Sequence, residues 1–416
     1  MSLKINFSQL PQLPKLEEKI LAYWKKNKVF QKTITNRQNS PPYIFYDGPP
    51  FATGMPHYGH LLASTTKDVI PRFQTMKGKK VERTWGWDCH GLPIENIIEK
   101  KLSIENKAEI EKIGIDKFNN HCAVEVLRLD KEWEKIITRL GRFVDFKNNY
   151  KTMDFNYMES IWWAFKKLDE KKLIYQGQKV ILYCPHCQTP LSNFEIAMDE
   201  SYENIETDSI FVQFPLLKQK NCFFLAWTTT PWTLPGNVAL ALDQNANYAL
   251  VKYGDNFYYL AQGLIDKVFL SQPHQIIKIV KGKELLNLKY QPPFVQTQDS
   301  QAYKIIASQF INLEEGTGLV HTAPCYGEED YLLGQKNKLP LIEVLDRQGK
   351  FLFSEKPFNN YFFKKANPLI IDYLKNKNFL FQTKKITHSY PFCYRCHSPL
   401  YYQALPAWFL NIAKIF

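Results

Sequence analysis

The sequence predicts an α/β protein in which a β-rich domain interrupts a helix-rich one. Its 416 residues exceed the size at which a single hydrophobic core keeps growing. Helical periodicity covers about residues 100–175, whereas short β-type runs extend from about residue 205 to 380. Two Cys-x-x-Cys turns stand on either side of the β-type region. Because these turns are alike, we expect an inserted domain that leaves and re-enters the first one at neighbouring points.

The composition is that of a globular protein, with 45% apolar and 15% aromatic residues. No stretch approaches the roughly 18–20 uninterrupted apolar residues of a membrane helix, and the start at Met1–Lys4 has no apolar signal core. We therefore expect a cytoplasmic monomer with no membrane partner. The formal charge of +12 favours a polyanionic partner such as nucleic acid, although the excess of Lys over Arg is equally compatible with a biased genome.

The first part of the chain carries the pattern of a βαβ unit. Tyr43–Tyr46 is typical of a short buried strand that runs into the Gly/Pro-rich turn at 47–50. A helix is then expected to end near Gly78, with Pro71 as the place for a kink. Lys80–Arg83 is predicted to be the following strand.

Helical spacing predicts further buried faces. Leu16, Ile20 and Trp24 behind Pro14 indicate an amphipathic opening helix. In the later helical region the residues expected to be buried are Phe118, Val124, Leu127, Trp133, Met158, Trp162, Phe165 and Leu168. In the β-type region we expect strands that include Ser209–Val212, Val238–Ala241 and Tyr248–Val251, with a turn at Gly254–Asn256.

The two Cys-x-x-Cys turns have the spacing at which one tight loop presents two thiolates to a tetrahedral Zn²⁺ ion. The predicted ligands are Cys184, Cys187, Cys393 and Cys396. Each pair is followed by the same x-(Ser/Thr)-Pro-Leu pattern, at 188–191 and at 397–400. The alternatives are two unrelated pairs or a redox dithiol. The other four cysteines, Cys89, Cys122, Cys222 and Cys325, have no partner at metal spacing and are expected to be plain thiols.

Two histidines three residues apart, His57 and His60, stand at a predicted helix start beside Gly54 and Gly59. Free backbone N–H groups and the helix dipole favour phosphate there, and imidazole donors can stabilise charge on a transferring phosphate. The alternative is an incidental His-x-x-His pattern without a ligand.

The run Asp-Gly-Pro-Pro-Phe-Ala-Thr-Gly at 47–54, together with His-Tyr-Gly-His at 57–60, resembles the first signature of class I aminoacyl-tRNA synthetases, in the form typical of isoleucyl enzymes. Gly86–Glu95 resembles the stretch that closes their amino-acid pocket. Valyl and leucyl enzymes typically carry Asn-Val-Thr-Gly or Tyr-Pro-Ser-Gly ahead of the histidines. The resemblance spans nearly the whole chain and favours isoleucine.

The resemblance implies a Rossmann-like catalytic domain that uses ATP with Mg²⁺, isoleucine and tRNA(Ile). It assigns ATP binding to Gly54, His57, Gly59 and His60, with both histidines acting in adenylate formation. It assigns the amino group of isoleucine to Gly48, Pro49 and Asp88. A carboxylate beside Trp87 suits an ammonium group in an otherwise apolar pocket, whereas Trp85 and Trp87 could equally be plain core residues.

Two further runs indicate a second site. The run at 227–237 places hydroxyl groups between aromatic and proline residues, which suits hydrogen bonding to a ribose, although a plain strand face is the alternative. Its candidate residues are Thr228, Thr229, Thr230, Trp232 and Asn237. The run at 316–331 pairs His321 with the acid Asp330, which could anchor an ammonium group and orient water for ester hydrolysis.

Both runs resemble the editing domain of isoleucyl, valyl and leucyl enzymes. By that resemblance Asp330 would hold the amino group of a misattached amino acid, His321 would line the pocket and the Thr run would grip the terminal adenosine. Cys325 stands where Gly or Ala is usual and would narrow the pocket. A second, smaller sieve is needed because one methylene separates Ile from Val, and the isoleucyl enzymes are the standard example of that limit.

We therefore expect a helix and the first half of a class I catalytic domain at 1–183, a zinc knuckle and stalk at 184–204, a mixed α/β editing domain at 205–387 and a second knuckle at 388–416. No run resembles the Lys-Met-Ser-Lys-Ser-like loop of the family, so we do not expect aminoacylation by this chain alone. The alternatives are a free-standing proofreading hydrolase and a non-catalytic zinc and tRNA-binding module.

Overall fold

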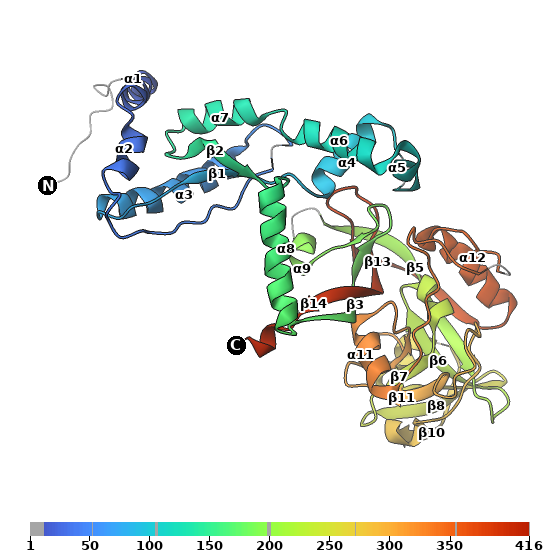
Figure 1. Cartoon of the computed structure of the whole chain (residues 1–416). Helices are drawn as coiled ribbons and strands as arrows, with labels where there is room; N and C mark the ends of the chain where they lie inside the picture. Colours follow the sequence, from blue (N-terminus) through green and yellow to red (C-terminus); the bar gives the residue numbers. More distant parts are fainter. Residues whose placement is uncertain are drawn as a thin grey trace. The chain divides into compact units, whose positions relative to one another are not determined.

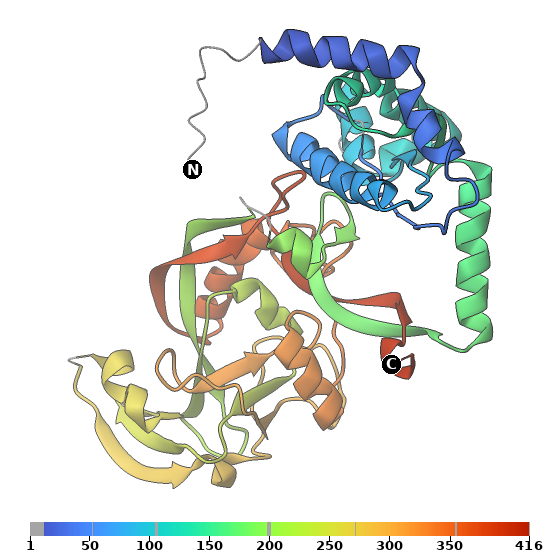
Figure 2. The same cartoon turned by 90° about the vertical axis from the view of Figure 1, so that its left-hand side faces the viewer.

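A computed structural model describes residues 12–51, 53–104, 107–197, 201–270, 272–353 and 356–415, so Ala52 of the first signature lies outside the described residues. The chain divides into two compact units, Met1–Leu173 and Ile174–Phe416 (Figures 1 and 2). The four-part division expected from the sequence stays a prediction, because this division falls at a single place.

Unit 1 packs helices around a short parallel pair of strands. Its elements are α1 (Leu13–Lys26), α2 (Val29–Thr35), α3 (Tyr58–Met76), β1 (Thr84–Trp87), α4 (Leu92–Lys101), α5 (Lys107–Ile113), α6 (Ile115–Val126), α7 (Asp130–Arg139), β2 (Asp145–Lys151) and α8 (Phe155–Glu170). Strand β1 pairs with β2 from Thr84↔Asp145 to Trp87↔Lys151. The core beside this pair contains Trp85, Trp87 and Trp133.

The predicted opening helix forms as α1, but its expected apolar face is not buried, since Leu16 and Ile20 are each 39% exposed. The helix before Gly78 is confirmed, and Pro71 lies inside α3, which continues to Met76. The predicted strand at Tyr43–Tyr46 is wrong. In the described part of unit 1 this segment makes no strand ladder, and its Ile44 and Tyr46 side chains are 73% and 90% exposed. Extended backbone becomes a strand only where a neighbour bonds to it, and the nearest contact is the bridge between Pro42 and Lys80.

The strand predicted at Lys80–Arg83 is displaced, because the paired strand β1 begins at Thr84. The βαβ unit expected around α3 is therefore absent from the described residues in that form. The parallel pair that does form joins β1 to β2, which follows it after four helices of the described chain. The local sequence pattern predicted extended backbone near this position. Which residues form the paired strand depends on β2, which lies far along the chain.

The predicted buried faces divide into two groups. Phe118 and Trp133 are buried as predicted. Val124, Trp162 and Phe165 were wrongly predicted, because they are 76%, 72% and 42% exposed. Leu127, Met158 and Leu168 are half-buried. Helical spacing reveals an apolar stripe on α6 and α8, but it cannot show whether another element covers that stripe.

Unit 2 contains three sheets within the described residues, in the orders β10-β8-β9-β6-β5-β13, β11-β7-β12 and β14-β3-β4. The strands are β3 (Ile174–Cys184), β4 (Thr189–Pro190), β5 (Tyr202–Pro215), β6 (Cys222–Thr228), β7 (Ala239–Leu242), β8 (Asn247–Tyr253), β9 (Asn256–Ala261), β10 (Gln275–Lys281), β11 (Lys304–Ala307), β12 (Leu319–Thr322), β13 (Leu380–Pro391) and β14 (Tyr401–Leu410). The helices include α9 (Asn193–Ile196), α10 (Ile265–Phe269), α11 (Glu328–Asn337) and α12 (Phe363–Asn376), with 3-10 turns η2 (Pro231–Gly236), η3 (Gln262–Leu264), η4 (Gly282–Leu285) and η5 (Ile412–Lys414).

The predicted strands in this region are confirmed, since Ser209–Val212 lies in β5 and Tyr248–Val251 in β8. The predicted turn joins β8 to β9 as a hairpin with Tyr253 paired to Asn256. Strand β3 pairs antiparallel with β14 from Ile174↔Leu410 to Tyr183↔Tyr401 (Figure 1). The segments that begin and end unit 2 therefore lie side by side.

In the described part of the chain, every helix is too short or too polar to cross a membrane.

The packing of unit 2 can be tested at a glycine. A Cβ atom at Gly282 would lie 2.2 Å from the backbone oxygen of Asp243. Gly282→Ala should therefore lower the free energy of unfolding by about 1–3 kcal/mol, as overpacking does. Gly263 is the matched control because a Cβ atom there meets nothing within 4 Å. Urea unfolding measures both variants, and equal stability of the two would contradict the packing described.

Candidate functional site

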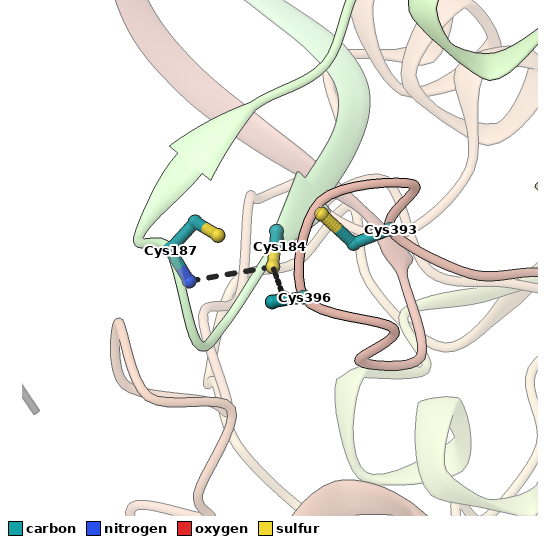
Figure 3. Close-up of side chains that lie close together, drawn as sticks. All are labelled: Cys184, Cys187, Cys393 and Cys396. Carbon is teal, nitrogen blue, oxygen red and sulfur yellow. Dashed lines mark hydrogen bonds between the residues drawn. The ribbon is translucent and has the colours of Figure 1, made fainter. Parts of the chain in front are cut away.

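Four cysteines from two distant parts of the chain meet in unit 2 (Figure 3). The sulfur atoms of Cys184, Cys187, Cys393 and Cys396 all lie within 4.8 Å of one another. Sγ of Cys184 is 3.4 Å from Sγ of Cys396, and the backbone N–H of Cys187 donates to Sγ of Cys184 at 3.3 Å. The structure brings together the four predicted ligands. Cys184 ends β3, Cys187 lies in the turn before β4, and Cys393 and Cys396 lie in the loop between β13 and β14.

The two Cys-x-x-Cys turns are hairpins with the same register. Tyr183, just before the first turn, pairs with Pro190, and Phe392, just before the second, pairs with Pro399. Gln188 and His397, the residues that follow the second cysteine of each turn, both have a left-handed backbone with φ of 50° and 60°. The repeated sequence pattern therefore corresponds to a repeated backbone conformation.

The cluster meets the requirements of a metal site made of four thiolates. With Zn–S bonds of about 2.3 Å, tetrahedral sulfurs lie roughly 3.8 Å apart, which this cluster can reach by small side-chain rotations. Hydrogen bonds from Cys184 and Cys187 lower the pKa of the Cys393 and Cys396 thiols, and the same sharing of protons raises the pKa of Cys184 and Cys187. The cysteines are all free of disulfides. The four thiols can therefore hold a metal ion.

Ion pairing ties the second turn to the segment after the first. The carboxylate of Glu195, on α9, contacts the guanidinium of Arg395 and accepts from the hydroxyl of Tyr394 at 3.0 Å. Glu195 also caps its own helix by accepting from the N–H of Ser192 at 2.8 Å. The two halves of the cysteine cluster are thus held in place by contacts outside the sulfurs.

In unit 1, His57 and His60 form a reciprocal cap at the start of α3. Nδ1 of His57 accepts from the N–H of Gly59 at 3.1 Å, and Nδ1 of His60 accepts from the N–H of His57 at 3.3 Å. Their ring centroids are 3.7 Å apart, and the ring of His60 lies 4.8 Å from that of Trp133. Because both Nδ1 atoms accept, the neutral rings carry their proton on Nε2, where each can donate to a ligand.

This cap changes part of the expectation from the sequence. The N–H of Gly59 is used by His57, so it is not free for a phosphate. A Cβ atom at Gly59 would lie 2.9 Å from the His57 ring, so this glycine makes room for the capping imidazole. Burial, followed by the charges of His57 and Lys67, lowers the pKa of His60 and favours its neutral form. A Cβ atom at Gly54 or Gly48 would meet nothing within 4 Å.

The residues expected to hold the amino acid lie on two adjacent segments. The N–H of Asp88 donates to the carbonyl of Pro50 at 3.0 Å, and Phe51 forms a bridge with Asp88. The loop with Gly48 and Pro49 therefore runs beside the half-buried Asp88. Trp85 and Trp87 are 2% and 3% exposed and belong to the core of unit 1, which favours their packing interpretation.

In unit 2, hydroxyl groups from the Thr run form a chain that ends on a histidine. Thr230 Oγ1 lies 3.3 Å from Thr228 Oγ1 and 3.4 Å from Thr233 Oγ1. The Thr233 hydroxyl donates to the carbonyl of Thr230 at 2.9 Å and lies 2.9 Å from Nε2 of His321. Because the Thr233 hydroxyl has given its proton to Thr230, Nε2 of His321 is the donor in their contact. Thr229, between Thr228 and Thr230 in the sequence, is half-buried.

His321 is a neutral ring inside the domain. Burial lowers its pKa to about 4, and its Nδ1 atom is buried without a hydrogen-bond partner among the described residues. Strand β12 places it opposite Leu240 of β7, and the carbonyl of the next residue, Thr322, accepts from the N–H of Val238. The long-range pairing of β7 with β12 thereby joins the two motifs.

Two of the predicted binding residues are part of the core. The Trp232 ring packs edge-on against the rings of Tyr326, Phe363 and Tyr401, with centroids 5.3, 4.9 and 5.7 Å away. Asn237 is fully buried and uses its side chain internally, accepting from Tyr290 at 2.7 Å and donating to the carbonyl of Ala239 at 2.9 Å. Trp232 and Asn237 are therefore core residues that stabilise the segment carrying the Thr run.

Asp330 lies in the first turn of α11 and folds back onto the segment that follows β12. Its Oδ2 accepts from the N–H of Ala323 at 2.9 Å. Burial raises the pKa of Asp330 to about 6, the Ala323 hydrogen bond opposes that rise, and the charge of Glu329 adds to it. No described cation pairs with this carboxylate within the distance of an ion pair, so a cationic ligand would be the partner that it lacks.

Cys325 lies between His321 and Asp330 in the sequence and is 1% exposed. It belongs to the main core of unit 2 together with Trp232 and Tyr326. Burial raises the pKa of its thiol to about 12, so it is a neutral core residue.

The sequence did not single out Thr233, which links the Thr run to His321. Its position three residues after Thr230 is a local signal for contact within a turn. The contact with His321, however, spans 88 positions and depends on the pairing of β12 with β7. Sequence spacing could not have revealed it.

Comparison with known proteins agrees with these motifs. The family described as "tRNA synthetases class I (I, L, M and V)" matches residues 19–416. Isoleucine--tRNA ligase 2 of Pseudomonas fluorescens is 43% identical over 97% of this chain and 39% of its own length. Isoleucine--tRNA ligases of Treponema denticola and Thermus thermophilus are each 43% identical over 96% of this chain and over 40% and 38% of their own lengths. The chain therefore spans about two fifths of the length of these relatives.

Among solved structures, "The crystal structure of GlLeuRS-CP1" covers 42% of this chain and 99% of that chain, at 12% identity and a TM-score of 0.36. This likeness is too weak to establish a shared fold. The family match across nearly the whole chain, together with the signature at 47–60, leads to one conclusion: the chain belongs to the class I tRNA synthetases of the isoleucine, leucine, methionine and valine group.

Proposed function

We propose that this chain supplies two sites of an isoleucine–tRNA ligase, one for activating isoleucine with ATP and Mg²⁺ and one for hydrolysing tRNA(Ile) that carries valine. Identity of 43% to proteins named isoleucine–tRNA ligase along 96–97% of the chain supports the choice of amino acid. The observation that carries the activation site is the reciprocal histidine cap, which occupies both Nδ1 atoms and leaves two Nε2 donors for a ligand.

The activation site would use charge and hydrogen bonding to bind ATP. With Nδ1 of His57 and His60 occupied by backbone N–H groups, each Nε2–H can donate to a phosphate oxygen. Gly54 has no side chain that would obstruct the nucleotide, and Gly59 leaves room for the capping ring of His57. Asp88, with the loop at Gly48 and Pro49 beside it, would hold the ammonium group of isoleucine. The Mg²⁺ ion would arrive with the nucleotide.

Replacing both histidines tests the activation site. His57→Ala combined with His60→Ala should weaken binding of a non-hydrolysable isoleucyl-adenylate analogue by about 10- to 100-fold, as expected for lost hydrogen bonds to a charged group. Calorimetry measures the affinity. The matched control is His121→Ala, which changes an exposed histidine of α6 in the same unit. Equal affinity in the double variant and the control would contradict the assignment.

The editing site would read the misattached amino acid through Asp330 and His321. The ionised carboxylate of Asp330 could pair with the ammonium group of valine, because no described residue neutralises it. The Nδ1 atom of His321 could accept from a donor of the substrate, which would relieve its missing hydrogen bond. The hydroxyl groups of Thr228, Thr229 and Thr230 would contact the terminal adenosine.

The raised pKa of Asp330 predicts a pH dependence. Hydrolysis of valyl-tRNA(Ile) should fall as the pH is lowered through about 6, because the protonated acid cannot pair with an ammonium group. In Asp330→Asn the rate should be low and should not change with pH in that range. Deacylation of labelled valyl-tRNA(Ile) measures both. A rate in the variant equal to that of the unchanged chain would refute the role of Asp330.

The same variant should remain folded. Because burial makes the folded pKa of Asp330 higher than its unfolded value, its ionisation lowers stability as the pH rises through about 6. Asn keeps an oxygen that can accept from the N–H of Ala323 and carries no charge. Asp330→Asn should therefore be at least as stable at neutral pH, and unfolding curves recorded beside the activity separate loss of function from loss of fold.

We propose further that the four cysteines bind Zn²⁺ at the base of an inserted domain. The pairing of β3 with β14 supports the insertion, because the first and last strands of unit 2 are neighbours. The sulfur cluster supports the metal. Zinc would supply a tetrahedral link between the two hairpins, and the cysteines, as thiolates, would hold it without taking part in either reaction.

Metal analysis tests this site. The purified chain should contain about one Zn²⁺, and changing Cys184 and Cys187 together to Ser should remove it, because two thiolates alone bind the ion too weakly. The matched control is Cys122→Ser, which removes a half-buried free thiol from unit 1. Zinc content that stays unchanged in the double variant, or is absent from the unchanged chain after refolding with Zn²⁺, would reject the assignment.

A further inference from the structure

Unit 1 contains a buried carboxylate that is held by two cations. The side chain of Asp47 is 8% exposed, and its two oxygens face different partners. Oδ2 contacts the guanidinium of Arg142, whose side chain is 6% exposed, and Oδ1 lies 2.5 Å from Nζ of Lys67. Lys67 is 32% exposed, whereas Arg142 and Asp47 are buried, so removing either buried partner would leave the other charge buried and unpaired, which is costly.

Each cation also contacts a second group, and these groups are the parts of the proposed activation site. Nζ of Lys67 donates to the carbonyl of Gly48 at 2.8 Å, which fixes the loop expected to hold the amino acid. Nη1 of Arg142 donates to Ser64 at 3.0 Å. Ser64 and Lys67 both lie on α3, the helix whose first turn carries the histidine cap. We call Asp47, Lys67, Arg142 and Ser64 the loop–helix clamp.

Two further contacts stiffen the clamp. The hydroxyl of Tyr150 donates to the backbone carbonyl of Asp47 at 3.1 Å, and the Arg142 guanidinium lies 5.2 Å from the centre of the Trp85 ring. Asp47 is therefore fixed by hydrogen bonds to its backbone carbonyl and to Oδ2, while Oδ1 makes a charge contact with Lys67. The partners come from α3, from β2 and from the segment before β2, so nothing local in the sequence would position this residue.

We propose that Asp47 is a positioning residue: through the loop–helix clamp it sets the distance between the isoleucine-binding loop and the phosphate-binding turn of α3. This inference rests on the proposed activation site. Formation of an adenylate requires the carboxylate of the amino acid to meet the α-phosphate of ATP, so the relative placement of the two subsites matters more than the affinity of either. A displacement of about 1 Å can cost on the order of 100-fold in such reactions.

This role predicts a specific pattern of binding. In Asp47→Asn, two cations would face a neutral amide, and the clamp should loosen. Isoleucine alone and ATP alone each use one subsite, so their affinities should fall by no more than about threefold. A non-hydrolysable isoleucyl-adenylate analogue spans both subsites, so its affinity should fall by about 30- to 100-fold. A residue that merely stabilised the fold would weaken all three ligands alike.

Asp68→Asn is the matched control. Asp68 also lies on α3, has a side chain only 13% exposed, pairs with Arg72 and accepts from the N–H of Phe143 at 3.1 Å. It thus links the same helix to the segment next to Arg142, and its hydrogen bonds and ion pair go to Arg72 and Phe143 rather than to residues 47–51. Asp68→Asn should lose stability comparably and keep the affinity for the analogue within threefold. Asp47→Glu, which keeps the charge, should recover part of the affinity lost in Asp47→Asn.

Hydrogen exchange provides a readout without a ligand. Exchange at the hydrogen-bonded amides of His57, Gly59 and Asp88 should accelerate together in Asp47→Asn and stay unchanged in Asp68→Asn. Should Asp47→Asn fail to fold, Arg142→Lys serves instead, since it keeps the charge but cannot contact Asp47 and Ser64 at once. Unchanged exchange, or equal losses for all three ligands, would overturn the clamp. If the unchanged chain does not bind the analogue, the proposed activation site is refuted. The hydrogen-exchange measurement then still tests whether Asp47 holds the loop and α3 together.

Discussion

The antiparallel pairing of β3 with β14 is the contact on which the arrangement of unit 2 depends. It runs from Ile174↔Leu410 to Tyr183↔Tyr401 and brings together two segments separated by most of the unit. Closing so long a loop costs chain entropy, but that cost grows only slowly with length, so one continuous ladder can compensate it. The four cysteines lie at the end of this ladder, where β3 stops and just before β14 begins. A metal at that point would fix the closure.

Burial gives two carboxylates of this chain opposite chemical characters. Asp47 has a cation beside each carboxylate oxygen, so its charge is balanced by residues of the protein itself. Asp330 has one backbone N–H and the like charge of Glu329, and burial raises its pKa to about 6. A paired acid is suited to hold backbone segments in register. An acid with no cation is suited to bind one from a substrate. The same residue type thus carries a paired charge in unit 1 and a charge without a described cation in unit 2.

Neutral histidines serve both units in a similar way. In unit 1, the backbone holds Nδ1 of His57 and His60, which leaves Nε2 to donate. In unit 2, Thr233 holds Nε2 of His321, which leaves Nδ1 to accept. In each case a hydrogen bond to one nitrogen fixes what the other can offer. The ring nitrogens left over are thus donors in unit 1 and a buried acceptor in unit 2. These assignments agree with the anionic and cationic ligands of the two proposed reactions.

Much of this protein was determined by the sequence alone. The two Cys-x-x-Cys patterns, the strands of unit 2 and the helix after the first signature could be predicted, because each depends on local spacing or on a short motif. The tertiary structure decided what local spacing cannot. The segment 43–46 has strand composition but forms no ladder beyond the bridge at Lys80, and Trp162 and Phe165 of α8 are exposed. The clamp at Asp47, the contact of Thr233 with His321 and the inward roles of Trp232 and Asn237 likewise depend on residues tens to hundreds of positions apart. The physical reason is that a side chain's charge, proton and exposure are set by its neighbours in space, and only the folded chain defines those neighbours.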